Sequence, residues 1–173
     1  MHLSYFDLTV PVFKKNLLIA QMLLQKGLDH ALETGMSETD FLEQRLAPDM
    51  FPLIRQVQIV TDNAKGATSR LTGIEAPVIT DTETSVAELI SRIDTVIAYL
   101  DTFTHEQFTN AAEQKIMLPY VPDQYQTGAD YFKDFVQPNF FFHMTMIYAL
   151  VRAQGTSVGK MDFIGNLNLH PVS

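Results

Sequence analysis

Residues 137–152, with the sequence QPNFFFHMTMIYALVR, decide the fold. Large apolar side chains recur along this stretch every three or four residues, which is the spacing of one face of a buried helix. They are Phe140, Met144, Ile147, Tyr148 and Val151. Pro138 stands near the start, where a helix tolerates proline, and Gly155 marks the end. The stretch therefore predicts a core helix that carries a single imidazole, His143, among aromatic residues.

Three further long helices are expected before this one. The first covers residues 3–33, with a stripe of apolar side chains that steps by four and three. The stripe is Phe6, Val10, Phe13, Leu17, Ala20, Leu24 and Leu28. Leu18, Met22 and Leu32 are expected to widen this apolar face. Pro11 removes one backbone hydrogen bond, so we expect a kink there or a helix that starts just before it.

The second and third helices are predicted over residues 50–71 and 85–104. Asp49 is expected to cap the second, and Gly73 to end it. Its apolar stripe is Leu53, Val57, Val60, Ala64, Ala67 and Leu71. Ser85 and Glu88 have the spacing of a capping box at the start of the third. Its apolar positions are Val86, Leu89, Ile90, Ile93, Val96, Ile97, Leu100 and Phe103.

The helical period is lost over residues 108–135, where we expect a long crossover. Residues 115–118 and 120–121 predict short extended pieces, which a small hairpin would join. Loops of this length in compact domains often carry a function or cover a site. The tail 158–165 mixes glycine with apolar residues, so it is expected to dock on the helices, with Lys160 and Asp162 making charged hydrogen bonds.

Four amphipathic helices with a long third connection predict an all-α protein, a four-helix bundle that forms one domain over residues 1–173. The net charge of -8 argues against a nucleic-acid partner and against an anionic membrane surface. The chain has no cysteine, which excludes disulfides, thiolate metal sites and a cysteine nucleophile. Without a signal peptide or an apolar span, a soluble cytoplasmic protein is expected.

Four segments carry a resemblance that covers nearly the whole chain. They are PDMFP at 48–52 running into QVQI at 56–59, AKG at 64–66, NFFFH at 139–143, and GKMDFIG at 159–165. In this order they resemble a bacterial family of unknown function that is related to the DinB/YfiT-like metalloenzymes. The resemblance implies an up-down-down-up four-helix bundle, often dimeric. The superfamily includes metal-dependent thiol transferases that act on small molecules.

The resemblance also implies a metal site that this sequence does not complete. The superfamily uses one histidine from the second helix and an H-x-x-x-H pair from the fourth. His143 matches the first histidine of that pair, but Ile147 stands in place of the second. The second helix has no histidine, and Gln56 is the polar residue nearest to that position. One imidazole and one amide make a poor site for a divalent metal, which normally takes three or more protein ligands.

The candidate ligand-binding residues are His143, Gln56, Asn63, Asn139 and Tyr148. The imidazole would serve as a metal ligand, a general base or a hydrogen-bond anchor; alternatively, it is a neutral core histidine bonded to Gln56 or to another helix. Gln56 and Asn63 are two helical turns apart and share a face, and Asn139 lies one turn before His143. Tyr148 carries a hydroxyl that needs a partner if it is buried.

Other polar residues are expected to lie at the surface. Gln58 is expected to face water, the usual position of glutamine on a helix. The remaining histidines do not pair at metal-ligand spacing, and we expect them to be exposed. They are His2, His30, His105 and His170. The glycines form no phosphate-binding loop and no nucleophile elbow, so nucleotide hydrolysis and serine-hydrolase chemistry have no support.

Three functional interpretations remain open. The first, which we favour, is a DinB-like protein that has lost the standard metal site and binds a small molecule between the second and fourth helices without a cofactor. The second is a metal-dependent small-molecule transferase, on thiols for example, or a hydrolase, with zinc or nickel at an unusual ligand set around His143. The third is a non-catalytic dimeric module. A homodimer is expected, and the catalytic residues stay unassigned.

Overall fold

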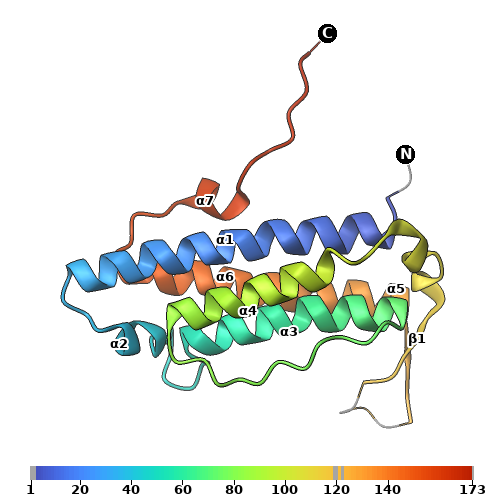
Figure 1. The fold of residues 1–173 in the computed structure, drawn as a ribbon, viewed down its shortest axis with the longest axis horizontal. Helices are drawn as coiled ribbons and strands as arrows, with labels where there is room; N and C mark the ends of the chain where they lie inside the picture. The colour runs from blue at the N-terminus through green and yellow to red at the C-terminus, as the bar shows by residue number, and fades with distance from the viewer. Residues whose placement is uncertain (1–2, 119–120, 122, 173) are drawn as a thin grey trace.

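The computed structural model describes residues 3–118, 121 and 123–172. Four long helices lie side by side in a bundle: α1 (Tyr5–Glu33), α3 (Leu53–Thr72), α4 (Val86–Leu100) and α6 (Gln137–Ala153). Figure 1 shows that α3 and α4 run in one direction and that α1 and α6 run in the other. This is the up-down-down-up arrangement, and the predicted all-α bundle is confirmed. The short helix α2 (Glu38–Leu42) connects α1 to α3.

The core lies between the four apolar stripes that the sequence predicts. On α6 the buried members are Phe140, Met144, Ile147 and Val151, and on α1 they are Val10, Phe13, Leu17, Ala20 and Leu24. The expectation that Leu18 and Leu32 widen the face of α1 is wrong, because both side chains are exposed. Leu17 and Leu24 point into the bundle, and a position one residue further is turned by about 100°. Leu18 therefore faces outward.

Helix α1 begins at Tyr5, well before Pro11, so the alternative of a start just before the proline is wrong. Ser4 and Asp7 set this start with a capping box. The hydroxyl of Ser4 accepts a hydrogen bond from the backbone N–H of Asp7 at 3.2 Å, and the carboxylate of Asp7 accepts one from the backbone N–H of Ser4 at 2.8 Å. Two orphan N–H groups at the helix end are satisfied in this way.

The predicted ends of α3 and α4 need three corrections. Pro52, not Asp49, is the N-cap of α3, and it makes no side-chain capping bond. Ser85 does cap α4, but the carboxylate of Glu88 accepts from the backbone N–H of Thr84 at 2.6 Å, one residue before the cap. Helix α4 ends at Leu100 rather than near 104, because the chain turns there to enter a 3-10 helix. Gly73 ends α3 in the left-handed conformation, as predicted.

The crossover contains more structure than the sequence predicts. Its first elements are η1 (His105–Phe108), η2 (Ala111–Glu113), β1 (Lys115–Ile116) and β2 (Gln126–Thr127). The two strands form an antiparallel ribbon. Residues 115–116 thus pair with Gln126–Thr127. The hairpin predicted from the sequence joins them to residues 120–121 instead, and residue 120 lies outside the described residues.

Helical structure resumes before the point that the sequence predicts. Helix α5 (Gly128–Tyr131) and the π-helix η3 (Phe132–Val136) lead directly into α6. A π-helix fits an extra residue into a turn, which shifts the apolar spacing and hides the helix from a period of 3.6. Position 128 requires glycine for a steric reason, because a Cβ atom there would lie 1.7 Å from the carbonyl oxygen of Ala111.

The C-terminal tail docks on the bundle, as predicted. Helix α7 (Lys160–Ile164) lies along α1, and the ring of Phe163 packs edge-on against Tyr148 at 5.7 Å. Asp162 accepts a hydrogen bond from Lys26 at 2.9 Å. Lys160 is exposed and makes no ion pair with any described residue, so its expected role is wrong. None of the helices in the described ranges has the length and apolar character needed to cross a bilayer.

Candidate functional site

His143 lies on the side of α6 that packs against α3, and 7% of its surface is exposed. Its Nδ1 atom is 2.7 Å from Oε1 of Gln56, which is also buried. The amide nitrogen Nε2 of Gln56 donates to the backbone carbonyl of Phe51 at 3.0 Å. The imidazole is therefore joined to α3 and, through Gln56, to the segment that precedes α3.

These two hydrogen bonds determine which nitrogen of the His143 ring carries the proton. Because Nε2 of Gln56 donates to a carbonyl, the amide oxygen faces His143 as an acceptor, and Nδ1 must carry the proton. Burial and, to a smaller extent, the positive charge of Arg55 lower the pKa of His143 to about 4. The ring is therefore neutral at pH 7, with the lone pair on Nε2. No described residue forms a hydrogen bond with that atom.

A polar network lies beside this pair, on the same helix. Arg55 forms an ion pair with Asp81 and donates to Oε1 of Gln58 at 3.1 Å. Gln58 in turn donates to Glu83 at 2.9 Å. The expectation that Gln58 faces water is wrong, since only 5% of its surface is exposed. The segment between α3 and α4 runs back along α3 and brings Asp81 and Glu83 to it, which the local sequence does not reveal.

Arg92 of α4 is the centre of this network, and its side chain is 1% exposed. The guanidinium donates to Thr61 at 2.7 Å, to Glu83 at 2.9 Å and to Asp62 at 2.8 Å, and it lies 3.0 Å from Asp81. Burial alone would lower the pKa of Arg92, but the surrounding carboxylates raise it. The pKa of Glu83 is lowered although its burial acts to raise it, because Arg92 bonds to the carboxylate.

The sequence carries one signal for the burial of Arg92. Arg92 stands inside the apolar stripe of α4, one turn from both Leu89 and Val96. A cation at such a position must find anionic partners on a neighbouring element if it is buried. The network fixes α4 and the segment before it against α3, and so holds the part of α3 that carries Gln56.

The remaining candidate residues divide into two groups. Asn63 is buried on α3, and its Oδ1 atom has no hydrogen-bond partner; Asn139 is half-buried one turn before His143. Tyr148 instead packs against Phe163 of α7, on a different side of α6 from His143. The structure therefore brings His143 and Gln56 together, leaves Asn63 two turns along α3 from Gln56 and Asn139 one turn before His143, and places Tyr148 elsewhere.

The residues around His143 do not fit the metal centre of the superfamily. Nδ1 is engaged by Gln56, and the position one turn on is filled by Ile147, which is fully buried in the core. Across the described ranges, no three side chains of histidine, aspartate or glutamate are grouped so that they could hold a metal ion. The positive charge that lowers the pKa of His143 also opposes a cation at Nε2.

The other histidines contribute nothing to this site. His105 is exposed and lies 3.2 Å from the hydroxyl of Ser4, and His170 is exposed in the C-terminal segment. His30 is half-buried instead of exposed, because its ring lies close to Gly155 at the end of α6. His2 lies outside the described residues.

Comparisons with known proteins agree with this fold. A family model described as a domain of unknown function, DUF1993, matches residues 5–164. Among solved structures, the crystal structure of a DinB family member protein from Shewanella denitrificans is 38% identical and superimposes with a TM-score of 0.94. The match covers 97% of this chain and 96% of that chain. No curated protein matches the sequence.

Proposed function

The chain belongs to the DUF1993 family, and from that premise we propose that it binds a small molecule between α3 and α6 through His143, without a metal ion. The observation that carries this proposal is the state of the imidazole. Gln56 holds the proton on Nδ1 at 2.7 Å, and the lowered pKa keeps the ring neutral. Nε2 then offers a lone pair of fixed direction that no described residue uses.

The chemistry of the site selects the ligand. A lone pair on neutral nitrogen accepts a hydrogen bond, so the ligand presents an O–H or N–H group to it. The nearby charge of Arg55 disfavours a cationic ligand. Oδ1 of Asn63, two turns further along α3, is buried without a partner and is not accessible to a ligand, so His143 alone supplies the accessible acceptor. A neutral compound with a hydroxyl or amide group meets these requirements.

Ligand screening by NMR with a panel of neutral polyols, amides and thiols tests the proposal. We expect binders whose affinity falls at least about tenfold in His143→Phe, which keeps a ring of similar size but removes both nitrogens. His105→Phe is the matched control, because that ring is exposed beside Ser4 and Phe6 and not beside Gln56, and it should leave affinity unchanged. Binding that is equal in the wild type and in His143→Phe would overturn the proposal.

Metal analysis of untagged protein separates this function from a metal-dependent transferase or hydrolase. We expect no stoichiometric zinc or nickel that depends on His143. A full equivalent of metal that disappears in His143→Ala would instead support the metal-dependent enzyme. A protein that binds neither metal nor any member of the panel would support a non-catalytic module.

The homodimer and the cytoplasmic location expected from the sequence stay proposals. Sedimentation equilibrium tests the first, and we expect twice the mass of one chain. Fractionation of cells that express the protein tests the second, and we expect it to appear with the cytoplasmic markers. Neither proposal depends on the ligand of His143.

A further inference from the structure

An open groove of about 650 Å³ lies on the outside of the bundle, between α1 and α7. The residues that line it are Lys15, Leu18, Ile19, Met22, Met161, Asp162, Gly165 and Asn166. Leu18 on one side of the groove is 53% exposed, and Met161 on the other is 60% exposed. More than half of the surface of each residue is therefore in water, and burying it would be favourable.

The C-terminal segment 167–172 carries apolar side chains that are exposed in the same way. Leu167 is 56% exposed, Leu169 is 78% exposed, and Val172 is fully exposed. The two leucines alternate with polar residues, so an extended chain places both of them on one side. The segment makes no hydrogen bond with any described residue. Both its backbone and its leucines are thus available to another surface.

The start of this segment is held at the groove itself. Lys15 of α1 donates a hydrogen bond to the backbone carbonyl of Asn166 at 2.7 Å. Gly165 is in the left-handed conformation and lies so close to α1 that a Cβ atom would be 2.9 Å from Cδ1 of Ile19. Figure 1 shows that the chain then runs away from the four helices. The segment therefore leaves its own groove without filling it.

We infer that the groove receives segment 167–172 of a second copy of this chain, and that the exchange is reciprocal. The inference rests on the homodimer proposed above and names the contact that holds it together. In a dimer with two-fold symmetry, both copies use the same surface. Two grooves that face one another place the start of each segment beside the groove of the other copy. Leu167 and Leu169 then cover Leu18 and Met161.

The segment is long enough for this exchange. Residues 167–172 span about 20 Å when extended at ~3.3 Å per residue. Packed helices lie about 8–10 Å apart. The groove runs about 10 Å along α1 between Lys15 and Met22, at ~1.5 Å per residue. The segment can therefore cross to the facing copy and still lie along its groove.

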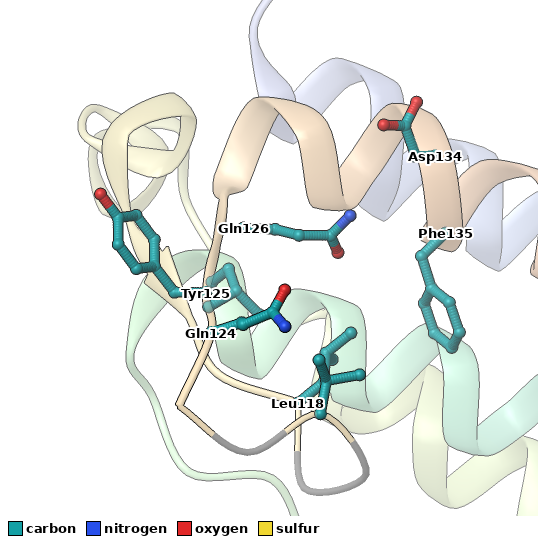
Figure 2. A pocket seen from close by; sticks show the side chains of 8 residues that line it. Leu118, Gln124, Tyr125, Gln126, Asp134 and Phe135 are labelled. Carbon is teal, nitrogen blue, oxygen red and sulfur yellow. The ribbon is translucent and has the colours of Figure 1, made fainter.

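A second hollow of the molecule fits the leucines less well. It has a volume of about 300 Å³ and lies where the β1–β2 ribbon meets η3. Figure 2 shows the side chains of Gln124 and Gln126 extending toward the helix that carries Phe135. A leucine placed there would remove water from the exposed amide of Gln124 without offering it a hydrogen bond. The segment also begins at the groove on α1, so the groove is the better site.

Sedimentation equilibrium of the full chain tests the inference. Leu169→Asp changes the segment and Leu18→Asp changes the groove, and both positions are exposed, so circular dichroism should show folded protein. We expect each variant to raise the dissociation constant of the dimer at least about tenfold. Val78→Asp is the matched control, at a valine that is 90% exposed and outside the groove, and it should dimerise as the wild type does.

The outcomes separate this inference from the proposals on which it rests or which it accompanies. A wild-type protein that sediments as a single chain would overturn both the exchange and the homodimer. A wild-type dimer that Leu169→Asp and Leu18→Asp leave intact would overturn the exchange alone. His143→Phe should dimerise as the wild type does, because the groove contains no part of the His143 site.

Cross-linking shows which copy fills the groove. Because the chain has no cysteine, Leu18→Cys and Leu169→Cys each introduce a single thiol. A mixture of the two variants, one of them carrying a mass tag, should give a covalent dimer of mixed composition with a short bis-maleimide. Val78→Cys in place of Leu18→Cys should not. A double variant, Leu18→Cys with Leu169→Cys, that is linked only within single chains would show the segment folded onto its own groove, which would overturn the inference.

Discussion

The carboxamide of Gln56 holds the imidazole of His143 in a single tautomer, with Nδ1 of the ring 2.7 Å from Oε1 of the amide. The carbonyl of Phe51 sets the direction of that amide by accepting from its nitrogen at 3.0 Å. Three groups from two parts of the chain thus determine which ring nitrogen carries a lone pair. A histidine bonded in this way is both a satisfied core residue and a directed acceptor, so the two interpretations of His143 are compatible.

Stability should depend on pH through His143. The pKa of this ring is about 4 in the folded protein and 6.5 in the unfolded chain, so the unfolded state binds more protons between these values. The part of the stability that depends on the neutral ring of His143 is fully present above about pH 6.5 and is lost as the pH falls toward 4. We expect a loss on the order of 2–3 kcal/mol in the free energy of unfolding.

Urea titrations at several pH values measure this dependence, and His143→Phe should show a correspondingly smaller one. Carboxylates also titrate in this range, but they do so in both proteins and cancel in the difference. His170→Phe, at an exposed histidine, is the control and should behave as the wild type does. Identical pH dependence in the wild type and in His143→Phe would contradict the burial of a neutral ring.

Replacing Gln56 by methionine keeps the volume of the side chain but removes the acceptor for Nδ1. The buried N–H of His143 would then lack a partner, which should cost about 1–3 kcal/mol in urea unfolding. Gln25→Met, at an exposed glutamine of α1, should change stability much less. The double variant Gln56→Met with His143→Phe replaces both partners, so it should cost less than the sum of the single changes. Strict additivity would show that the pair is not coupled.

Arg92→Met should destabilise the protein by about 3–5 kcal/mol, because it leaves Glu83 buried without its cation. Arg45→Met is a matched control at the surface, where Arg45 pairs with Glu43 at 3.2 Å. Exposed ion pairs contribute about 0–1 kcal/mol, so the control should stay within that range. Thermal or urea unfolding measures both. A similar small loss in the two variants would show that the network around Arg92 is not stabilising.

Gly128→Ala should destabilise the protein by about 1–3 kcal/mol or more, because the new methyl group would collide with the backbone of η2. The Cβ atom would lie 1.7 Å from the carbonyl oxygen of Ala111, and backbone cannot move aside as a side chain can. Gly66→Ala is the contrasting variant in the middle of α3. Its Cβ atom would meet the end of the flexible Arg70 side chain at 2.7 Å. We expect it to gain up to about 1 kcal/mol from helix propensity. Equal effects of the two substitutions would contradict this account.

Much of the bundle could be predicted from local patterns. The stripe of α6 and that of α4 identified buried faces because apolar side chains on a helix must leave water together. The hydroxyl of Ser85 and the left-handed conformation of Gly73 identified helix ends because such groups satisfy or close a helix locally. The π-helix before α6 was missed because its extra residue breaks the period on which the prediction depends.

The candidate site was only partly predictable. The sequence indicated His143 and gave its partner as Gln56 or another helix, since a four-helix bundle packs these helices together. It did not indicate that Gln58 is buried, that Arg92 bonds to three acidic side chains, or that Oε1 of Gln126 is buried without a partner. Each of these depends on a connecting segment whose path no local pattern specifies.

The amino-acid sequence by itself therefore determined the helices, their buried faces and the absence of histidine from residue 147 and from the second helix. Those features follow from residue identity and from spacings of three to seven positions. Only the tertiary structure decided the tautomer of His143 and the partners of Arg92. These features require groups from distant parts of the chain to meet within hydrogen-bond distance, and packing of the whole bundle brings them together.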